Sequence, residues 1–231
     1  MSAPDKEFIC GAFDSITPHY DMLNQVLSLG MAGSWRKRSA KILLSDPRFS
    51  PKTLLDLGCG TGKFLECFLR GRSWEGVTGV DFSVAMLKKA RETVPGTVMR
   101  LQEEFDSLPF LESSFDLVIS AFTLRSVQKL PEFLNSVHRI LTPGGKAAFL
   151  DLTRPRDFWV RLFFFPYVRF MLPLLGWLFS GRREAYGFLS HSVRTFQPPG
   201  DTIQLMKAIG YRDLASKSFA FGAATLIIGT K

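Results

Sequence analysis

One stretch decides the fold: Asp56-Leu57-Gly58-Cys59-Gly60-Thr61-Gly62, directly after the apolar run Thr53-Leu54-Leu55. The apolar run predicts a buried strand, and the glycines let the chain turn sharply into a helix while a ligand approaches the backbone. A second apolar run ends at Asp81, 19 positions beyond Gly62. Because the carboxyl ends of parallel strands meet at one edge of a sheet, we expect the Asp81 carboxylate there, within reach of a ribose diol. The stretch therefore predicts a nucleotide site.

The spacing of the glycines distinguishes between two kinds of nucleotide. A dinucleotide site has the pattern G-x-G-x-x-G, whereas the third glycine here, Gly62, comes one residue early and is followed by Lys63. The spacing G-x-G-x-G resembles the S-adenosylmethionine-binding loop of class I methyltransferases. That resemblance makes S-adenosylmethionine the expected cofactor. A plain connector between a strand and a helix is the alternative, and Asp81 argues against it.

Strands alternate with helices along most of the chain. We expect strands at 53–57, 77–81, 97–101, 115–120 and 146–152, and helices at 63–70, from Ser83 onward, at 131–141 and at 201–209. This alternation predicts an α/β fold with a mainly parallel sheet and helices on both faces. Two closing strands, 215–221 and 223–230, are separated by Gly222 and predict an antiparallel hairpin. The arrangement resembles the seven-stranded, Rossmann-like sheet of class I methyltransferases.

The chain length of 231 residues predicts a single methyltransferase domain over 1–231. Within it, 1–45 is expected to form a helical lid, with two helices between Phe13 and Ala40, and 156–195 an apolar insertion facing substrate or membrane. The longest charge-free stretch of the insertion, Phe170 to Gly181, has 12 residues and contains a proline. A membrane-spanning helix needs roughly 20 apolar residues, so this class of segment is excluded. A core helix pair and an interfacial membrane element both remain open for 156–183.

The composition narrows the choice of partner. The formal net charge is +8 and Phe occurs 22 times. This combination favours a binding partner whose surface is both apolar and negatively charged. The basic clusters Trp35-Arg36-Lys37-Arg38 and Arg182-Arg183 are short, and no long Lys/Arg stripe indicates nucleic acid. We therefore expect peripheral membrane contact through 156–183 and no nucleic-acid partner, with a homo-oligomer left open.

Cysteine usage and the amino terminus indicate the compartment. The three cysteines, Cys10, Cys59 and Cys67, have no metal-ligand spacing, so no metal is expected. An odd count without a secretion signal favours reduced thiols. The expected location is the cytoplasm, at the inner face of the cytoplasmic membrane.

Segments along nearly the whole chain resemble the ubiquinone/menaquinone biosynthesis C-methyltransferase family. They are Tyr20-Asp21-Met22-Leu23-Asn24 with Trp35-Arg36, the glycine loop, Leu108-Pro109-Phe110 with Ser114-Phe115-Asp116, Leu124-Arg125-Ser126-Val127, residues 139–145 and 150–155, Tyr186-Gly187-Phe188-Leu189 with Ser192-Val193, and the Gly222 hairpin. The resemblance implies S-adenosylmethionine-dependent C-methylation of a prenylated quinol ring, with demethylmenaquinol to menaquinol as the expected reaction. The alternatives are another lipid (a ubiquinone precursor, a phospholipid amine or a tocopherol-like ring), a non-catalytic accessory protein of quinone biosynthesis and, third, RNA methylation.

Several positions depart from the family pattern. The residue after the Leu-Arg arginine is Ser126 instead of Asn, and the family's serine at the tip of the fourth strand is Ala121. Phe105 stands where a small residue is common, and Ile227 where a histidine is often found. These changes leave the cofactor fold intact and leave the identity of the quinone open.

The resemblance also implies cofactor-binding residues. Gly58, Gly60, Thr61 and Gly62 would surround the methionine part, Asp81 would accept both ribose hydroxyls, and Glu104 would accept from the adenine amino group. Asp56, in the same stretch, is a further expected cofactor-binding residue. Phe82 or Phe105 would lie on an adenine face, Tyr20 would close over the cofactor's carboxylate, and Ala121 would complete the site. Ordinary core packing is the alternative for the aromatic residues.

The reaction itself requires an electron-rich ring carbon. A phenol has a pKa of about 10, so a cation beside the oxygen is needed to polarise or remove the proton. We predict that Arg125 supplies that charge, with a loop-fixing salt bridge as the alternative. Asp151 is expected to orient a water or accept the proton, or else to cap a turn. His19, His138 and His191 are further candidates for a general base, with His138 expected at the surface.

Overall fold

The computed structural model describes residues 20–101, 108–155, 158–171 and 196–231. Its seven strands are β1 (Thr53–Leu57), β2 (Gly76–Asp81), β3 (Val98–Leu101), β4 (Phe115–Ala121), β5 (Leu141–Leu152), β6 (Arg212–Phe219) and β7 (Ala224–Thr230). They form one sheet in the order β3-β2-β1-β4-β5-β7-β6. The first five strands pair in parallel, and β7 runs antiparallel to both β5 and β6. The predicted parallel sheet with a closing antiparallel hairpin is confirmed.

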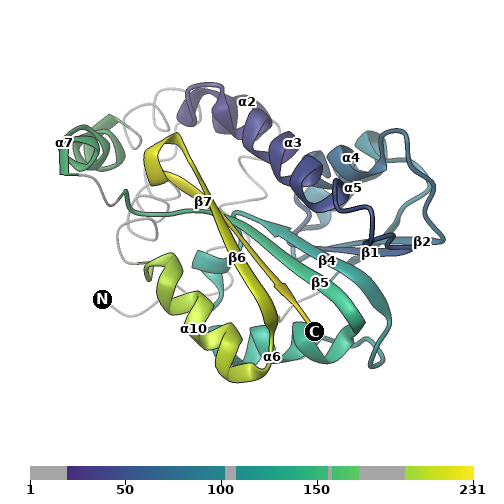
Figure 1. Ribbon diagram of the computed structural model, residues 1–231. Coiled ribbons are helices and arrows are strands. Elements are labelled where there is room, and N and C mark those ends of the chain that lie inside the picture. The colour runs from purple at the N-terminus through teal and green to yellow at the C-terminus, as the bar shows by residue number, and fades with distance from the viewer. Residues whose placement is uncertain (1–19, 102–107, 156–157, 172–195) are drawn as a thin grey trace.

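Helices cover both faces of the sheet (Figure 1). The described helices are α2 (Tyr20–Leu27), α3 (Met31–Leu44), α4 (Lys63–Leu69), α5 (Val84–Thr93), α6 (Leu130–Ile140), α7 (Phe158–Pro166) and α10 (Pro199–Ile209), with short turns η2 (Leu124–Ser126), η3 (Tyr167–Met171) and η4 (Ala220–Gly222). α3, α4 and α5 pack on one face, and α6 and α10 on the other. α6 shows why: Leu130, Phe133, Leu134 and Val137 recur at helical spacing and are all buried.

The central strand positions the glycine loop. Leu54, Leu55 and Leu57 of β1 are completely buried, because β1 lies between β2 and β4 and is covered on both faces. Leu54 belongs to the core under α3 and α4, and the other two belong to the core under α6. This alternation fixes the strand's register, so the loop that follows Leu57 lies at the carboxyl edge of the sheet.

Some predicted boundaries are wrong. β5 begins at Leu141 instead of 146, because Leu141 pairs with Phe115 before the turn at 143–145 shifts the register and Lys146 pairs with Leu117. β6 begins at Arg212 and ends at Phe219. The hairpin therefore turns through the whole of η4, where Phe221 has a φ of 56°. Hydrogen bonding to neighbouring strands, which the sequence does not display, sets these limits.

The predicted insertion is described only in part, since 156–157 and 172–195 lie outside the described residues. The described part consists of α7 and the π-helical turn η3. Leu162 is 52% exposed, Phe170 63% and Met171 45%. In the ranges that the structure describes, no helix combines the length and apolarity that crossing a membrane requires.

Candidate functional site

The glycine loop is held by backbone contacts that leave one position open. The amides of Gly58 and Cys59 both donate to the carbonyl of Val80, at 2.9 Å. Gly58 has a φ of +70°, and a Cβ there would lie 2.4 Å from Oγ1 of Thr123, so the loop after β4 requires a glycine at this position. Gly60 has a φ of +54°, and among the described residues only Cε1 of Tyr20 comes within 4 Å of where a Cβ would be, at 3.9 Å. Gly60 is therefore the glycine that a ligand can approach closely.

Asp81 joins the loop to β2. Its Oδ2 accepts from the amide of Gly60 at 2.8 Å and its Oδ1 accepts from the amide of Ser83 at 3.0 Å. The Ser83 hydroxyl in turn accepts from the amide of Met86 and caps α5, as its place in the sequence predicts. The carboxylate is fixed at the carboxyl end of β2, which is the position that recognition of a ribose diol requires.

Asp56 is the least satisfied polar group of the site. It is 1% exposed, and neither carboxylate oxygen has a hydrogen-bond partner among the described residues. Burial, followed by the negative charge of Asp81, raises the pKa of Asp56 to about 8, and Arg36 acts in the opposite direction. An unpaired buried carboxyl is costly, so this geometry suits a cationic, hydrogen-bonding ligand group. The amino group of the methionine part of S-adenosylmethionine has that chemistry, and the residues present fit it.

Two residues of α2 reach the glycine loop. Tyr20 lies over Gly60, and Asp21 accepts a hydrogen bond of 2.7 Å from the hydroxyl of Thr61. That Tyr20 closes over the carboxylate of the cofactor stays a prediction. Sequence reasoning gave Asp21 no role, although it belongs to the Tyr20–Asn24 segment. The hydroxyl of Thr61 is therefore engaged by α2 instead of being left for a ligand.

The site has one half at the ends of β1 and β2 and a second half at the ends of β4 and β5. The second half contains a buried ion pair between Arg125 and Asp151. The guanidinium contacts Oδ1 of Asp151, and the two side chains are 9% and 3% exposed. The Arg125 amide donates to Oδ2 at 3.2 Å, and the Leu152 amide donates to Oδ1 at 2.7 Å. Nε of Arg125 is buried and has no partner among the described residues. Arg125 thus forms the loop-fixing salt bridge foreseen as the alternative, and it retains one buried donor.

An aromatic ring connects the two halves. Phe122 follows β4 with a φ of 64°, a rare conformation for a residue other than glycine. Its ring lies 5.2 Å from Cζ of Arg36 and 6.0 Å from Cζ of Arg125, within the range of cation–π contacts. Neither Phe122 nor Arg36 was assigned a role from the sequence. No local pattern signals a ring shared by two arginines that are distant in the chain.

Of the other residues predicted for the site, three lie near the glycine loop or the strand ends, four lie outside the described residues, and His138 lies elsewhere. Ala121 is half-buried at the end of β4, and Phe82 is half-buried directly after Asp81; Gly62 precedes α4. Four predicted residues lie outside the described residues, namely His19, Glu104, Phe105 and His191.

His138 does not belong to the site, and the prediction that it lies at the surface is wrong in part. It is half-buried near the end of α6, where its ring packs edge-on against Tyr211 with centroids 4.8 Å apart. Burial lowers its pKa, as does the charge of Lys231. No cluster of metal-ligating residues is present in the described segments.

Comparison with known proteins agrees with this geometry. The sequence matches the ubiE/COQ5 methyltransferase family over residues 1–231. It is 36% identical to a demethylmenaquinone methyltransferase of Deinococcus radiodurans, over 95% of this chain and 90% of the relative. It is 35% identical to a ubiquinone/menaquinone biosynthesis C-methyltransferase UbiE of Geobacter sulfurreducens, over 97% and 89%.

The fold is similar to solved methyltransferases. A crystal structure of a SAM-dependent methyltransferase from Thermotoga maritima, a possible histamine N-methyltransferase, superposes with a TM-score of 0.68, covering 96% of this chain and 99% of that one at 20% identity. This likeness identifies the class I methyltransferase fold. With the family match, it confirms the expected enzyme class and cofactor. The chain therefore belongs to the ubiE/COQ5 methyltransferase family, as an S-adenosylmethionine-dependent C-methyltransferase of menaquinone or ubiquinone biosynthesis.

Proposed function

We propose that this enzyme methylates a ring carbon of demethylmenaquinol and produces menaquinol. The relative from Deinococcus radiodurans carries the corresponding name and is similar over nearly its whole length. The observation that carries the proposal is a buried cation in the turn after β4: Arg125 of η2, whose Nε has no partner among the described residues. An uncharged ring needs such a cation to become a nucleophile.

Arg125 acts on the quinol oxygen. A phenolic hydroxyl has a pKa of about 10, and a nearby fixed positive charge favours its ionised form. The Nε–H of Arg125 is the donor that we assign to that oxygen, since Nη1 is engaged by Asp151 and Nε is buried without a partner among the described residues. In a buried site such a contact stabilises developing negative charge more than it does in water.

Asp151 is a positioning residue in this proposal. Its carboxylate already accepts from two backbone amides and from the Arg125 guanidinium. It therefore orients Arg125 instead of accepting the quinol proton. Water takes up that proton and returns one to the oxygen, while the ring carbon that gains the methyl group loses its hydrogen to water as a proton, so that one proton is released for each methyl group transferred. Phe122 restricts the guanidinium from another side.

The cofactor is held at the other half of the edge. Asp56 pairs with the methionine ammonium, Asp81 with the ribose hydroxyls, and Gly60 lets the ligand lie against the backbone; Gly58, Gly62, Phe82 and Ala121 complete the described pocket, and Glu104 with Phe105 is assigned to the adenine. S-adenosylmethionine supplies the methyl group on a positively charged sulfur. Tyr20 covers Gly60, and so excludes water from the methyl group.

We also propose a single domain with two specialised segments. Residues 1–45 act as the lid, supported by the contact of Asp21 with Thr61 and of Arg36 with Phe122. Residues 156–183 contact the inner face of the cytoplasmic membrane, from which a prenylated substrate is drawn. The exposed apolar side chains of Leu162, Phe170 and Met171 support this role.

Methyl transfer to a lipid panel tests the function. Purified protein, detergent and S-adenosylmethionine are incubated with reduced demethylmenaquinol, a prenylated benzoquinol or a phospholipid amine, and products are identified by mass. We expect methylation of the naphthoquinol. Exclusive methylation of the benzoquinol would redirect the assignment to a ubiquinone precursor, which the name of the Geobacter relative also covers.

Arg125 is tested in the same assay. Arg125→Lys keeps the charge without the planar donor geometry, and Arg125→Met removes both. We expect kcat to fall by about 100-fold or more for Arg125→Met, the scale of losing one oxyanion donor. Unchanged turnover in Arg125→Met would remove Arg125 from the mechanism.

A further inference from the structure

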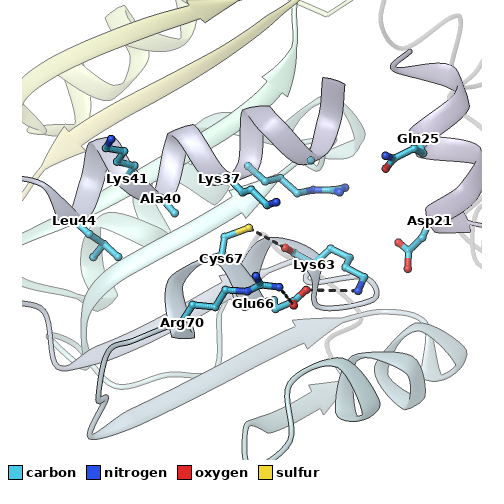
Figure 2. A pocket seen from close by; sticks show the side chains of 12 residues that line it. Asp21, Gln25, Lys37, Ala40, Lys41, Leu44, Lys63, Glu66, Cys67 and Arg70 are labelled. Carbon is cyan, nitrogen blue, oxygen red and sulfur yellow. Dashed lines mark hydrogen bonds and ion pairs between the residues drawn. The ribbon is translucent and has the colours of Figure 1, made fainter. Parts of the chain in front are cut away.

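A groove lies between α3 and α4, with α2 at one end (Figure 2). Its volume is about 460 Å³. Ala40, Leu44 and Cys67 give it an apolar lining, and none of the residues predicted to bind the cofactor is among its lining residues. Asp21 and Arg36 connect the groove to Thr61 and to Phe122, and the proposed methyl transfer gives the other lining residues no role.

The groove is strongly basic. Five basic side chains line it, Arg36, Lys37, Lys41, Lys63 and Arg70, against two acidic ones, so its net charge is +3. α3 contributes three of the five and contains no acidic residue along its whole length. A concave surface lined with one sign of charge concentrates its field and attracts an ion of the opposite sign.

The two acidic residues of the groove are already engaged. Glu66 contacts Arg70 at 2.5 Å and Lys63 at 3.5 Å, and the hydrogen bond from Arg70 is the main cause of its lowered pKa. Asp21 accepts from Thr61. Lys37 and Lys41 are exposed and have no ion-pair partner among the described residues. The charge that remains for a ligand is therefore that of α3.

Apolar side chains adjoin this charge. Met22 of α2 is 46% exposed, and Leu29, between α2 and α3, is 69% exposed. Asp21 and Gln25 of α2 line the groove, so Met22 belongs to the helix at its end, and Leu29 lies in the turn that joins this helix to α3. A basic groove bordered by exposed apolar residues matches a lipid surface, where phosphates and acyl chains are presented together. A nucleic acid offers no acyl region for Met22 and Leu29.

We propose that this groove binds the phosphate of an anionic phospholipid headgroup, with Lys37 and Lys41 as its principal contacts. This proposal rests on the proposed function in one respect: a prenylated quinol substrate is the reason why the enzyme would bind a membrane. It assigns to α3 an electrostatic contact separate from the apolar one of 156–183. The groove then places the lid, and with it the entrance to the site, against the bilayer.

Sedimentation with vesicles tests the groove in the full-length protein. The vesicles are phosphatidylcholine alone or a mixture with phosphatidylglycerol. The test variant is Lys37→Glu/Lys41→Glu, and the charge-matched control is Lys207→Glu/Lys217→Glu, because Lys207 of α10 and Lys217 of β6 are exposed and lie outside the groove. We expect the test variant to lose more than about tenfold of its partitioning onto the mixed vesicles, and the control less than about threefold.

Three results would overturn the proposal: equal losses in both double variants, unchanged binding of the test variant, or wild-type binding that ignores phosphatidylglycerol. A double-stranded RNA of matched charge that binds as tightly and is lost equally in the test variant would also overturn the lipid assignment. Far-ultraviolet circular dichroism of both double variants is measured in parallel and should match that of the wild type, so that a loss of vesicle binding is not a loss of folding. Methyl transfer by the wild-type protein to detergent-solubilised quinol is measured separately. If wild-type protein methylates no quinol, the proposed function fails, whatever the vesicles show.

Discussion

Asp56 and Asp151 occupy the ends of two strands at the same edge of the sheet, and they are almost equally buried, with 1% and 2% of their surface exposed. Their surroundings are opposite. Asp151 meets a guanidinium and two backbone amides, whereas Asp56 meets no hydrogen-bond donor among the described residues. The Asp151 carboxylate therefore has its hydrogen-bond and ion-pair partners in the protein without any ligand, and the Asp56 carboxyl has none among the described residues.

The difference fits the two proposed tasks of the site. The ion pair at the ends of β4 and β5 is organised in advance, as the proposed charge stabilisation requires. The buried carboxyl at the end of β1 is unfavourable without a partner, and the proposed cationic ligand group would relieve that cost, so that part of the stability would be exchanged for affinity. Variants at the two aspartates should therefore differ in the sign of their effect on stability.

The largest effect on stability is expected at the ion pair between Arg125 and Asp151. Asp151→Asn leaves the buried Arg125 charge without its counter-ion, which should lower the free energy of unfolding by ~3–5 kcal/mol. Urea denaturation followed by circular dichroism measures this. The control is the double variant Arg125→Met/Asp151→Leu, which should regain most of the stability while turnover stays abolished. An Asp151→Asn protein as stable as wild type would show that the pair is not formed.

At Asp56, whose carboxyl has no partner among the described residues, replacement should raise the stability instead of lowering it. Asp56→Asn removes a group that is costly to ionise, so stability should rise at neutral pH, while the affinity for S-adenosylmethionine falls about tenfold or more. Calorimetric titration gives the affinity, and Glu66→Gln, on the groove side of α4, serves as a carboxylate control. Weaker folding of Asp56→Asn at pH 8 would contradict the comparison.

The stability of the wild type and that of Asp56→Asn should depend differently on pH. The folded pKa of Asp56 is about 8, above the unfolded value of about 3.9, so the folded state holds the proton longer. Its contribution is fully present below pH ~4 and is lost as the pH rises through ~8. Melting temperatures of wild type should therefore decline across this window more steeply than those of Asp56→Asn. Parallel profiles would mean that Asp56 titrates normally.

A smaller effect should show how the two halves communicate. Phe122 holds a φ of 64°, where a residue with a Cβ is strained by ~1–2 kcal/mol. Phe122→Gly should therefore be more stable than Phe122→Ala by ~1 kcal/mol, while both lose the ring between Arg36 and Arg125. Turnover should fall equally in both. A drop in turnover that follows stability instead would make Phe122 a purely structural residue.

The smallest effect is expected at the lid. Thr61→Val removes the hydroxyl that Asp21 accepts from and should cost about 1 kcal/mol of stability. Because this contact joins the proposed lid to the glycine loop, KM for S-adenosylmethionine should rise a few-fold with kcat unchanged. Thr93→Val, on the outer turn of α5, removes another hydroxyl and is the control. Equal kinetic effects in both would remove the lid contact from the argument.

Sequence reasoning succeeded where the signal is local. The strand, the glycine loop and Asp81 lie within one short segment, and periodicity of apolar residues placed α6 and the helices after the glycine loop and Asp81 to within a few residues. Parallel pairing then follows for the strands joined through a helix, as β1 is to β2 through α4, β2 to β3 through α5 and β4 to β5 through α6. The resemblance to a family, carried by motifs along the chain, supplied the cofactor and the chemistry.

The amino-acid sequence by itself thus determined the parallel sheet, the edge that holds the site and the carboxylates at that edge. Only the tertiary structure decided which of these groups are paired. Arg125 and Asp151 are 26 positions apart, and Arg36 and Phe122 lie on different elements, so neither contact leaves a periodic trace. Periodicity reports burial, whereas the ionisation and role of a buried group depend on the partners that folding brings to it.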